Sequence, residues 1–371
     1  MSHEPGLASW LQLTITPGLG AAAIRGMLRE FGLPESVLSR SRADLARYAT
    51  PAALEALHSD DVAAAVRRAI EWVEQPQHFI VTLADTQYPR GLLEISDPPV
   101  LLYAVGRLEL LQGASLAVVG SRNASAQGES NAESFARVLS ESGLTIVSGL
   151  ALGIDAAAHR GGLAGPGSTI AVLGTGIDVV YPRRNGELSR EIAQRGLLVS
   201  EFPLATPPAA YNFPRRNRLI SGLTRGCLVV EAALASGSLI TARAAADQGR
   251  EVFAIPGSIH SPLYKGCHAL IKAGAKLVES ADDVLAELSG FRRSGYASTT
   301  APVLDASGTD ETALLARMGH EPVDIDSLCS IAGMSPEQVS AELLRLELDG
   351  RVTALPGGLY QRLEKGHGGK R

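Results

Sequence analysis

The sequence LAVVGSR (residues 116–122) sets the pattern for the middle of the chain, because a short apolar run ends there in a glycine and polar residues. Similar apolar runs follow at residues 144–148, 169–173, 197–200, 227–230 and 251–255. Runs that are apolar throughout are typical of parallel strands buried on both faces. Helical patterns fill the gaps between them, so residues 79–290 are predicted to form an α/β domain with an extended, Rossmann-like, doubly wound parallel sheet.

The first 78 residues have a helical pattern instead. Ile24, Met27, Leu28 and Phe31 recur at helical spacing, and a helical domain is therefore predicted over residues 1–78. Within it, the turn TPGLG (residues 16–20) joins two apolar helical runs. This arrangement is similar to SAM or helix-hairpin-helix domains, whose hairpin amides can meet a DNA phosphate. The alternative is an ordinary turn of a helical bundle, which is favoured because the segment holds nine acidic and seven basic residues.

The end of the chain predicts a second small domain. Residues 291–310 are rich in Ser, Thr, Ala and Gly and are typical of a linker. Residues 311–371 then predict a winged helix with a C-terminal β-hairpin wing. In its long helix, expected over 335–349, Ser335 is placed as the N-cap and Pro336 at the first helical position.

The long helix of this predicted winged helix is acidic on its exposed side. Glu337, Glu342, Glu347 and Asp349 stand against the single Arg345. Carboxylates that face a phosphate backbone repel it. The domain is therefore predicted to bind protein or to regulate, and not to read a DNA major groove.

Composition excludes several classes of protein. The three cysteines are far apart and have no CxxC spacing, which argues against a disulfide framework or a zinc site and fits a reducing compartment. The start of the sequence lacks the pattern of a signal peptide, and no apolar run is long enough to span a bilayer. A cytoplasmic protein without a membrane partner is predicted. The net charge of −5 means that any anion site must be a local cluster.

Small and polar residues follow the predicted strands, where parallel sheets bind their ligands. Gly120-Ser121-Arg122 follows the first run, Ser148-Gly149 the second, and Ser236-Gly237-Ser238 lies beyond the fifth. Glycine lets the backbone approach a phosphate, and a helix N-terminus offers free N–H groups. Each turn alone is explained by the tight packing of such folds, but the set favours an anion-binding edge of the sheet.

The sequence FPRRNR (residues 213–218) is the strongest local cluster, with three arginines and no acid. Arginine pairs with phosphate, and Tyr211 or Phe213 can stack on a base, which is what single-stranded nucleic acid requires. The alternative is that Phe213 belongs to the core and that an arginine pairs with a buried acid such as Asp155 or Glu231. We expect this alternative to hold for at least one of the arginines.

Evidence for catalysis is weak. Asp155 and His159 are spaced i and i+4, and Glu231 follows a predicted strand, but no nucleophile motif accompanies them. The third glycine of a GxGxxG fingerprint and the lysine of a Walker A motif are both missing. No cofactor, metal or enzymatic activity is predicted, and Asp155 and His159 are expected to hold loops through hydrogen bonds.

Taken in order, these motifs resemble those of the DNA-processing protein A (DprA/Smf) family. The motifs that carry the resemblance are GSR (120–122), SGLALGIDAAAH (148–159), AVLGTGID (171–178), SEFP (200–203), FPRRNR (213–218) and VEAALASGSLITA (230–242). The resemblance implies a protein that binds single-stranded DNA and protects it, and that loads the recombinase RecA during natural transformation. It also implies a homodimer formed through the Rossmann-like domain.

Site residues follow from matching positions. The single-stranded-DNA site is expected to comprise Ser121, Arg122, Gly149, Arg183, Tyr211, Phe213, Arg215, Arg216, Asn217, Arg218 and Ser238. The dimer contact is expected at His268, Leu270, Ile271 and Leu277. This chain departs from the family pattern at His268, where the family usually shows Asn.

The main alternative is an enzyme of the nucleotide phosphoribohydrolase type on the same fold. Those enzymes carry a Pro-Gly-Gly-x-Gly-Thr-x-x-Glu motif in the sheet domain, whereas this chain has ALASGS at residues 233–238. A double-stranded-DNA transcription factor is opposed by the acidic helix, and a dinucleotide dehydrogenase by the missing glycine fingerprint.

Overall fold

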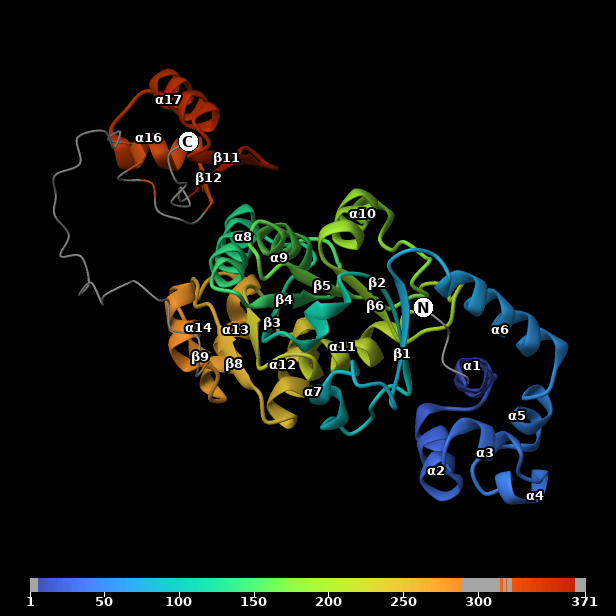
Figure 1. Ribbon diagram of the computed structural model, residues 1–371. Coiled ribbons are helices and arrows are strands. Elements are labelled where there is room, and N and C mark those ends of the chain that lie inside the picture. Colours follow the sequence, from blue (N-terminus) through green and yellow to red (C-terminus); the bar gives the residue numbers. More distant parts are fainter. Residues whose placement is uncertain (1–5, 289–313, 316–317, 319–321, 364–371) are drawn as a thin grey trace.

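The computed structural model of the chain describes residues 6–288, 314, 315, 318 and 322–363. The predicted linker at 291–310 and most of the predicted helix at 311–318 lie outside the described residues. A nine-stranded sheet forms the centre of the molecule (Figure 1). Six of its strands coincide with the predicted apolar runs: β3 (Ser115–Val119), β4 (Thr145–Ser148), β5 (Thr169–Val172), β6 (Leu197–Ser200), β7 (Gly226–Val229) and β8 (Glu251–Ala254).

The strand order is β1-β2-β6-β5-β4-β3-β7-β8-β9, in which all neighbours from β6 to β9 run parallel. The chain first builds outward from β3 through β4 and β5 to β6. It then crosses back to place β7 on the other side of β3. The order of the sheet therefore reverses between β3 and β7. At such a switch point the carboxyl ends of the two strands border a crevice in which α/β proteins bind ligands.

Two helical layers cover the sheet, as expected for a doubly wound fold (Figure 1). One contains α8 (Ala126–Glu141) and α9 (Ile154–Leu163), which pack on Leu116, Val118 and Ile146 of the sheet. The other contains α7 (Arg90–Leu93), α11 (Asn212–Gly222) and α12 (Ser238–Asp247). In the first layer the two helices approach closely because Gly161 has no side chain, and a Cβ atom there would lie 2.2 Å from the carbonyl oxygen of Glu133.

Three further strands lie at the ends of the sheet and were not among the predicted runs: β1 (His78–Thr82), β2 (Leu101–Gly106) and β9 (Lys276–Leu277). The first two form an antiparallel pair that joins β6. On the outer side of β1, the N–H of His78 donates to Gln75 O at 3.2 Å, and that of Thr82 donates to Asp85 Oδ2 at 2.6 Å. Turns thus occupy both ends of this outer strand. At the other end of the sheet, β9 pairs only with β8.

The N-terminal region is helical, as predicted. Its helices are α1 (Leu7–Ile15), α2 (Ala21–Phe31), α3 (Pro34–Leu38), α4 (Arg42–Leu45), α5 (Pro51–Ala56) and α6 (Asp60–Val73). They share a hydrophobic core with the sheet, in which Trp72 packs edge-to-face against Tyr103 of β2 with ring centroids 5.7 Å apart. The helical region is therefore seated on the sheet and not merely tethered to it.

The C-terminal part has the winged-helix arrangement. Its elements are β10 (Val323–Asp324), α16 (Ile325–Ala332), α17 (Pro336–Leu348), β11 (Val352–Leu355) and β12 (Leu359–Arg362). The expected start of the long helix is present: Ser335 Oγ accepts from the N–H of Gln338, whose side chain in turn accepts from the N–H of Ser335. The three strands pair in the order β10-β12-β11, and the last two form the wing.

Candidate functional site

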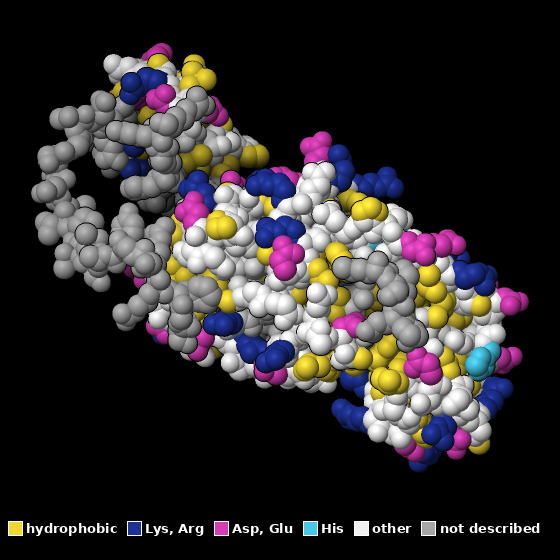
Figure 2. Space-filling view, viewed as in Figure 1, with side chains coloured by type: hydrophobic (Ala, Val, Ile, Leu, Met, Phe, Trp, Pro, Cys, Tyr) yellow, Lys and Arg dark blue, Asp and Glu magenta, His cyan; other side chains and the backbone are white. Residues whose placement is uncertain are grey.

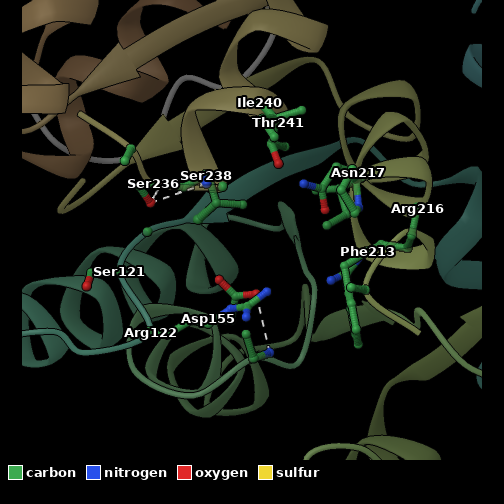
Figure 3. Close-up of a pocket in the computed structure, with 18 of the residues that line it drawn as sticks. Ser121, Arg122, Asp155, Phe213, Arg216, Asn217, Ser236, Ser238, Ile240 and Thr241 are labelled. Carbon is green, nitrogen blue, oxygen red and sulfur yellow. Dashed lines mark hydrogen bonds between the residues drawn. The ribbon is translucent and has the colours of Figure 1, made fainter. Parts of the chain in front are cut away.

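A cleft of about 700 Å³ opens at the point where the strand order reverses (Figure 3). Three of the segments that form its walls lie far apart in the sequence. The loop after β3 contributes Ser121 and Arg122, helix α11 contributes Phe213, Arg216 and Asn217, and the start of α12 contributes Ser238 and Thr241. The apolar strands place these segments together because their polar ends meet at one edge of the sheet.

One side of the cleft combines a cation with aromatic rings. Arg122 is exposed, and its guanidinium carbon lies 5.8 Å from the centroid of the Phe213 ring. Phe213 in turn lies 5.5 Å from the ring of Tyr181, at an interplanar angle of 38°. Among the described residues, no carboxylate lies within ion-pair distance of Arg122. This charge is therefore available to an anionic ligand.

The floor of the cleft holds a second guanidinium, which is buried. Arg216 is 4% exposed, and its Nη1 donates to the carbonyl of Val172 at the end of β5, while its Nε has no hydrogen-bond partner. Gly149 makes room for it, because a Cβ atom at that position would lie 2.2 Å from Nη1. Burial lowers the pKa of Arg216 to about 10 and Asp155 opposes this shift, so the group keeps its positive charge at neutral pH.

Asp155 is the one acid among the described residues that line the cleft. Its Oδ2 accepts from the N–H of Gly149 at 3.1 Å and from that of Ala151 at 3.4 Å. Burial raises the pKa of Asp155, while Arg216 and these two N–H groups favour its ionised form. Among the described residues that line the cleft, two arginines stand against one acid, although the chain as a whole carries a net charge of −5.

His159 and Glu231 do not line this cleft. The buried ring of His159 lies between Thr169 Oγ1, 2.7 Å from Nδ1, and the N–H of Leu150, which donates to Nε2 at 3.3 Å. Burial, together with Arg216, lowers the pKa of His159 to about 3, so the ring is neutral. The Glu231 carboxylate accepts two hydrogen bonds from Ser125, one from the backbone N–H at 2.9 Å and one from the hydroxyl at 2.5 Å. Both residues hold loops in place.

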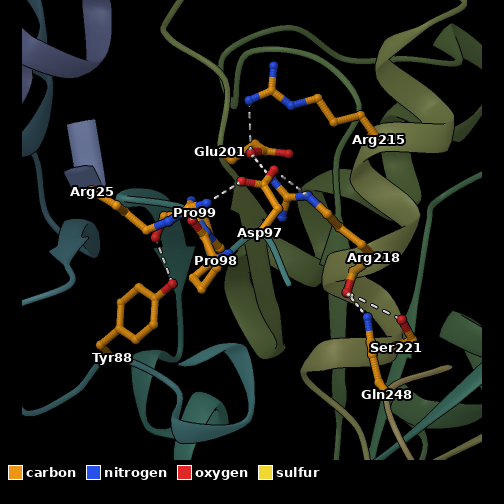
Figure 4. A network of polar contacts seen from close by, with 10 residues as sticks. All are labelled: Arg25, Tyr88, Asp97, Pro98, Pro99, Glu201, Arg215, Arg218, Ser221 and Gln248. Carbon is orange, nitrogen blue, oxygen red and sulfur yellow. Dashed lines mark hydrogen bonds and ion pairs between the residues drawn. The ribbon is translucent and has the colours of Figure 1, made fainter. Parts of the chain in front are cut away.

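Arg215 and Arg218 extend toward Glu201 (Figure 4), whereas Arg216 lines the cleft. Arg218 Nη2 pairs with Glu201 Oε2 at 2.5 Å and its Nε with Asp97 at 3.3 Å, while Arg215 reaches Glu201 at 3.4 Å. Asp97 also pairs with Arg25 of helix α2 at 2.8 Å. The Glu201 side chain is 3% exposed and that of Arg218 is 15% exposed. This network joins the helical region to α11, so Arg218 is used for structure.

Replacing Arg218 with methionine is expected to lower the free energy of unfolding by about 3 kcal/mol, because the buried Glu201 loses its closest cation. Denaturant unfolding followed by fluorescence of the two tryptophans, both in the helical region, would measure this. Adding Glu201→Gln to the variant should recover part of the loss. The control Arg160→Met breaks ion pairs with Glu129 and Glu133 whose side chains are all half-exposed, and should cost less than about 1 kcal/mol. Equal losses in both variants would contradict the assignment.

The expected DNA-site residues thus fall into two groups. Those that line the cleft are Ser121, Arg122, Phe213, Arg216, Asn217 and Ser238. Gly149 lies behind Arg216, whereas Arg183 and Tyr211 are exposed and outside the lining. Arg215 is half-exposed beside Glu201, and the structure places Arg218 away from the cleft. Thr241, which we did not single out from the sequence, lies three residues after Ser238 on the same helical face.

The described part of the chain has no cluster of three or more His, Cys, Asp or Glu placed to hold a metal ion. Within the same residues, none of the helices has the length and apolar character that a bilayer crossing demands.

Comparison with known proteins places this site in a family. Residues 79–289 match the family model described as DNA recombination-mediator protein A, and residues 298–358 match the model of the DprA winged helix domain. The chain belongs to the DNA recombination-mediator protein A family. The first match begins one residue after His78, the start of β1, and covers the rest of the sheet. It therefore includes all the residues that line the cleft.

Individual DprA relatives agree with this assignment. Protein Smf of Escherichia coli is 46% identical over 81% of this chain and 82% of its own length. The X-ray structure of DNA processing protein A from Streptococcus pneumoniae matches with a TM-score of 0.67 and 42% identity, over 75% of this chain and 95% of that chain. A Helicobacter pylori DNA processing protein A, from a structural study of its single-stranded-DNA binding mode, matches with a TM-score of 0.51 and 31% identity. That match covers 55% of this chain and 93% of the other.

Proposed function

We propose that this protein binds single-stranded DNA in the cleft at the β3/β7 switch point. The observation that carries the proposal is that the exposed guanidinium of Arg122 lies beside the aromatic rings of Phe213 and Tyr181 in this cleft. Phosphate–arginine pairing with base–aromatic stacking is the chemistry of single-strand binding. A single-stranded-DNA binding mode is also the subject of the Helicobacter pylori structure.

In this proposal the ligand contacts have separate tasks. Arg122 pairs directly with a phosphate, and the N-terminus of α12 at Ser238 adds N–H groups and a favourable dipole. Arg216 contributes its positive charge from the floor of the cleft, where Asp155 favours the charged form. The exposed Tyr211, Arg183 and Arg215 lie outside the lining and extend the contact along the strand as it leaves the cleft.

We also propose that the protein acts as a homodimer that protects single strands and loads the recombinase RecA onto them in the cytoplasm. The sheet ends at β9, where Leu277 is 47% exposed, with His268, Leu270 and Ile271 on the adjacent α13 (Lys265–Lys272). Two clefts on one DNA strand raise the avidity through effective concentration.

The proposed domain boundaries are 1–78, 79–290 and 311–371, with a linker at 291–310.

Binding, not catalysis, is the activity we propose. The ionisable groups closest to a catalytic arrangement are committed to loops: His159 is neutral and buried, Asp155 caps a turn, and Glu231 holds Ser125. A nucleotide phosphoribohydrolase on this fold would need an acid or base free to meet its substrate.

Fluorescence anisotropy with a labelled oligo-dT at two salt concentrations tests the proposal. We expect the affinity to fall at the higher salt concentration, because phosphate contacts release counterions from the DNA and added salt opposes that release. We also expect unlabelled single strands to compete more strongly than duplex DNA. A parallel assay follows release of free base from nucleoside monophosphates. Absence of salt-sensitive binding together with base release that Glu231→Gln abolishes would replace the proposal with the hydrolase.

A further inference from the structure

The long helix of the winged-helix part, α17, carries an apolar stripe on its outer face. Leu344 is 58% exposed and Leu348 is 82% exposed, whereas Val339, Leu343 and Leu346 of the same helix are buried in the domain core. With 3.6 residues per turn, Ala341, Leu344 and Leu348 fall on one line along the helix. This stripe runs for about two turns, and the described residues leave it uncovered.

Acidic side chains border the stripe. Glu337 continues its line toward the N-terminus, and Glu347 and Asp349 flank its C-terminal end, all three exposed. The one cation of α17, Arg345, is paired with Glu342 at 3.1 Å. Residues 322–363 hold six acidic residues and three arginines. Figure 2 shows hydrophobic and acidic side chains next to one another at the upper left, over α17.

These charges decide between the possible occupants of the stripe. In a winged helix that reads DNA, the exposed face of a helix lies in the major groove against phosphates. Here that face would bring Glu337, Glu347 and Asp349, which have no ion pair among the described residues, close to the phosphates, and the like charges repel each other. A second copy of the domain would bring the same acidic border and meets the same repulsion. A partner with basic residues is attracted.

We propose that the outer face of α17 docks a short amphipathic helix of a partner protein whose apolar residues are flanked by Lys or Arg. Leu344 and Leu348, spaced i and i+4, accept apolar side chains at the same spacing on the partner, as in other helix pairs. Glu337, Glu347 and Asp349 pair with the partner's cations and set its direction, as charges beside helix seams do. None of these residues lines the cleft, whose last lining residue, Thr241, comes well before α17 in the chain, and the inference does not depend on the proposed function.

The test uses the full chain and a fluorescent synthetic peptide that forms a helix with leucines at i, i+4 and i+7 and lysines beside them. A matched peptide carries glutamates in place of the lysines. We expect the lysine peptide to bind in a salt-sensitive manner and the glutamate peptide to bind at least about tenfold more weakly. Leu344→Ser with Leu348→Ser should weaken the lysine peptide by about tenfold or more. Leu33→Ser, at an exposed leucine of the helical region, is the matched control.

Both substituted leucines are exposed, so circular dichroism should show that the double variant folds. Glu337→Lys provides a second variant, which leaves the apolar stripe intact. Glu337→Lys should weaken the lysine peptide and strengthen the glutamate peptide. Equal binding of both peptides, or of wild type and the double variant, would overturn the proposal. So would self-association that Leu344→Ser abolishes, which would assign the stripe to a second copy, or duplex DNA binding that the same substitution removes.

Discussion

Replacing Arg122 with alanine is expected to weaken the binding of oligo-dT by about 10- to 100-fold. A charge-assisted hydrogen bond to phosphate contributes about 1.5–3 kcal/mol, and Arg122 is the exposed cation of the cleft with no competing carboxylate within ion-pair distance among the described residues. The side chain also lies over Phe213, so the same change removes a contact that orders the stacking ring. Anisotropy titrations at several salt concentrations measure the effect.

The salt dependence makes this prediction more specific. Loss of one phosphate contact should reduce the slope of log K against log salt by about 0.7 for a single strand. Arg68→Ala, at an exposed arginine of α6, is the matched control and should change neither quantity. Arg218→Met, in the folded state, should also keep its affinity because Arg218 points away from the cleft. An unchanged affinity for a folded Arg122→Ala variant would remove single-stranded DNA from this cleft.

Replacing Arg216 with methionine is expected to lower the free energy of unfolding by about 3–5 kcal/mol at pH 7. The variant leaves the carboxylate of Asp155 in the interior without the cation that stabilises its charge. Arg184→Met, which removes an exposed arginine, is the control and should cost less than about 0.5 kcal/mol. Denaturant or thermal unfolding measures both variants.

The pH dependence of the Arg216→Met variant follows from Asp155. Its pKa is already raised by burial, and loss of Arg216 raises it further. The folded variant then binds a proton more tightly than the unfolded chain does, so its free energy of unfolding rises as pH falls toward the ordinary carboxyl range. The deficit relative to wild type should therefore shrink between pH 7 and pH 5. Adding Asp155→Asn should recover much of the stability at pH 7. A deficit that is independent of pH and is not rescued would contradict this account.

Much of the sheet was predictable because parallel strands buried on both faces must be apolar throughout. The antiparallel pair β1–β2 was not among the predicted strands: β1 lies half-buried at the edge of the sheet, whereas β2 is apolar and buried like the core strands. The signal of β1 is therefore weaker than that of a core strand, while β2 carries the signal of a buried strand and could have been predicted from the sequence.

The site, too, was predictable from the sequence only in part. Glycines, serines and Arg122 at strand ends were predictable because strand ends converge. Which of the three neighbouring arginines enters the cleft was not. That choice depends on Glu201 and Asp97, which come from other parts of the chain and draw Arg215 and Arg218 away.

The two ends of the sheet differ in a way that bears on how many copies can assemble. At β1, turns occupy the outward N–H groups of His78 and Thr82, so a further strand finds few donors there. At β9, no strand of the described chain covers the outer side. A sheet that is closed at one end and open at the other can be extended only once. Two copies joined at their open ends around a twofold axis would present two closed ends, and growth into a filament would stop at the pair.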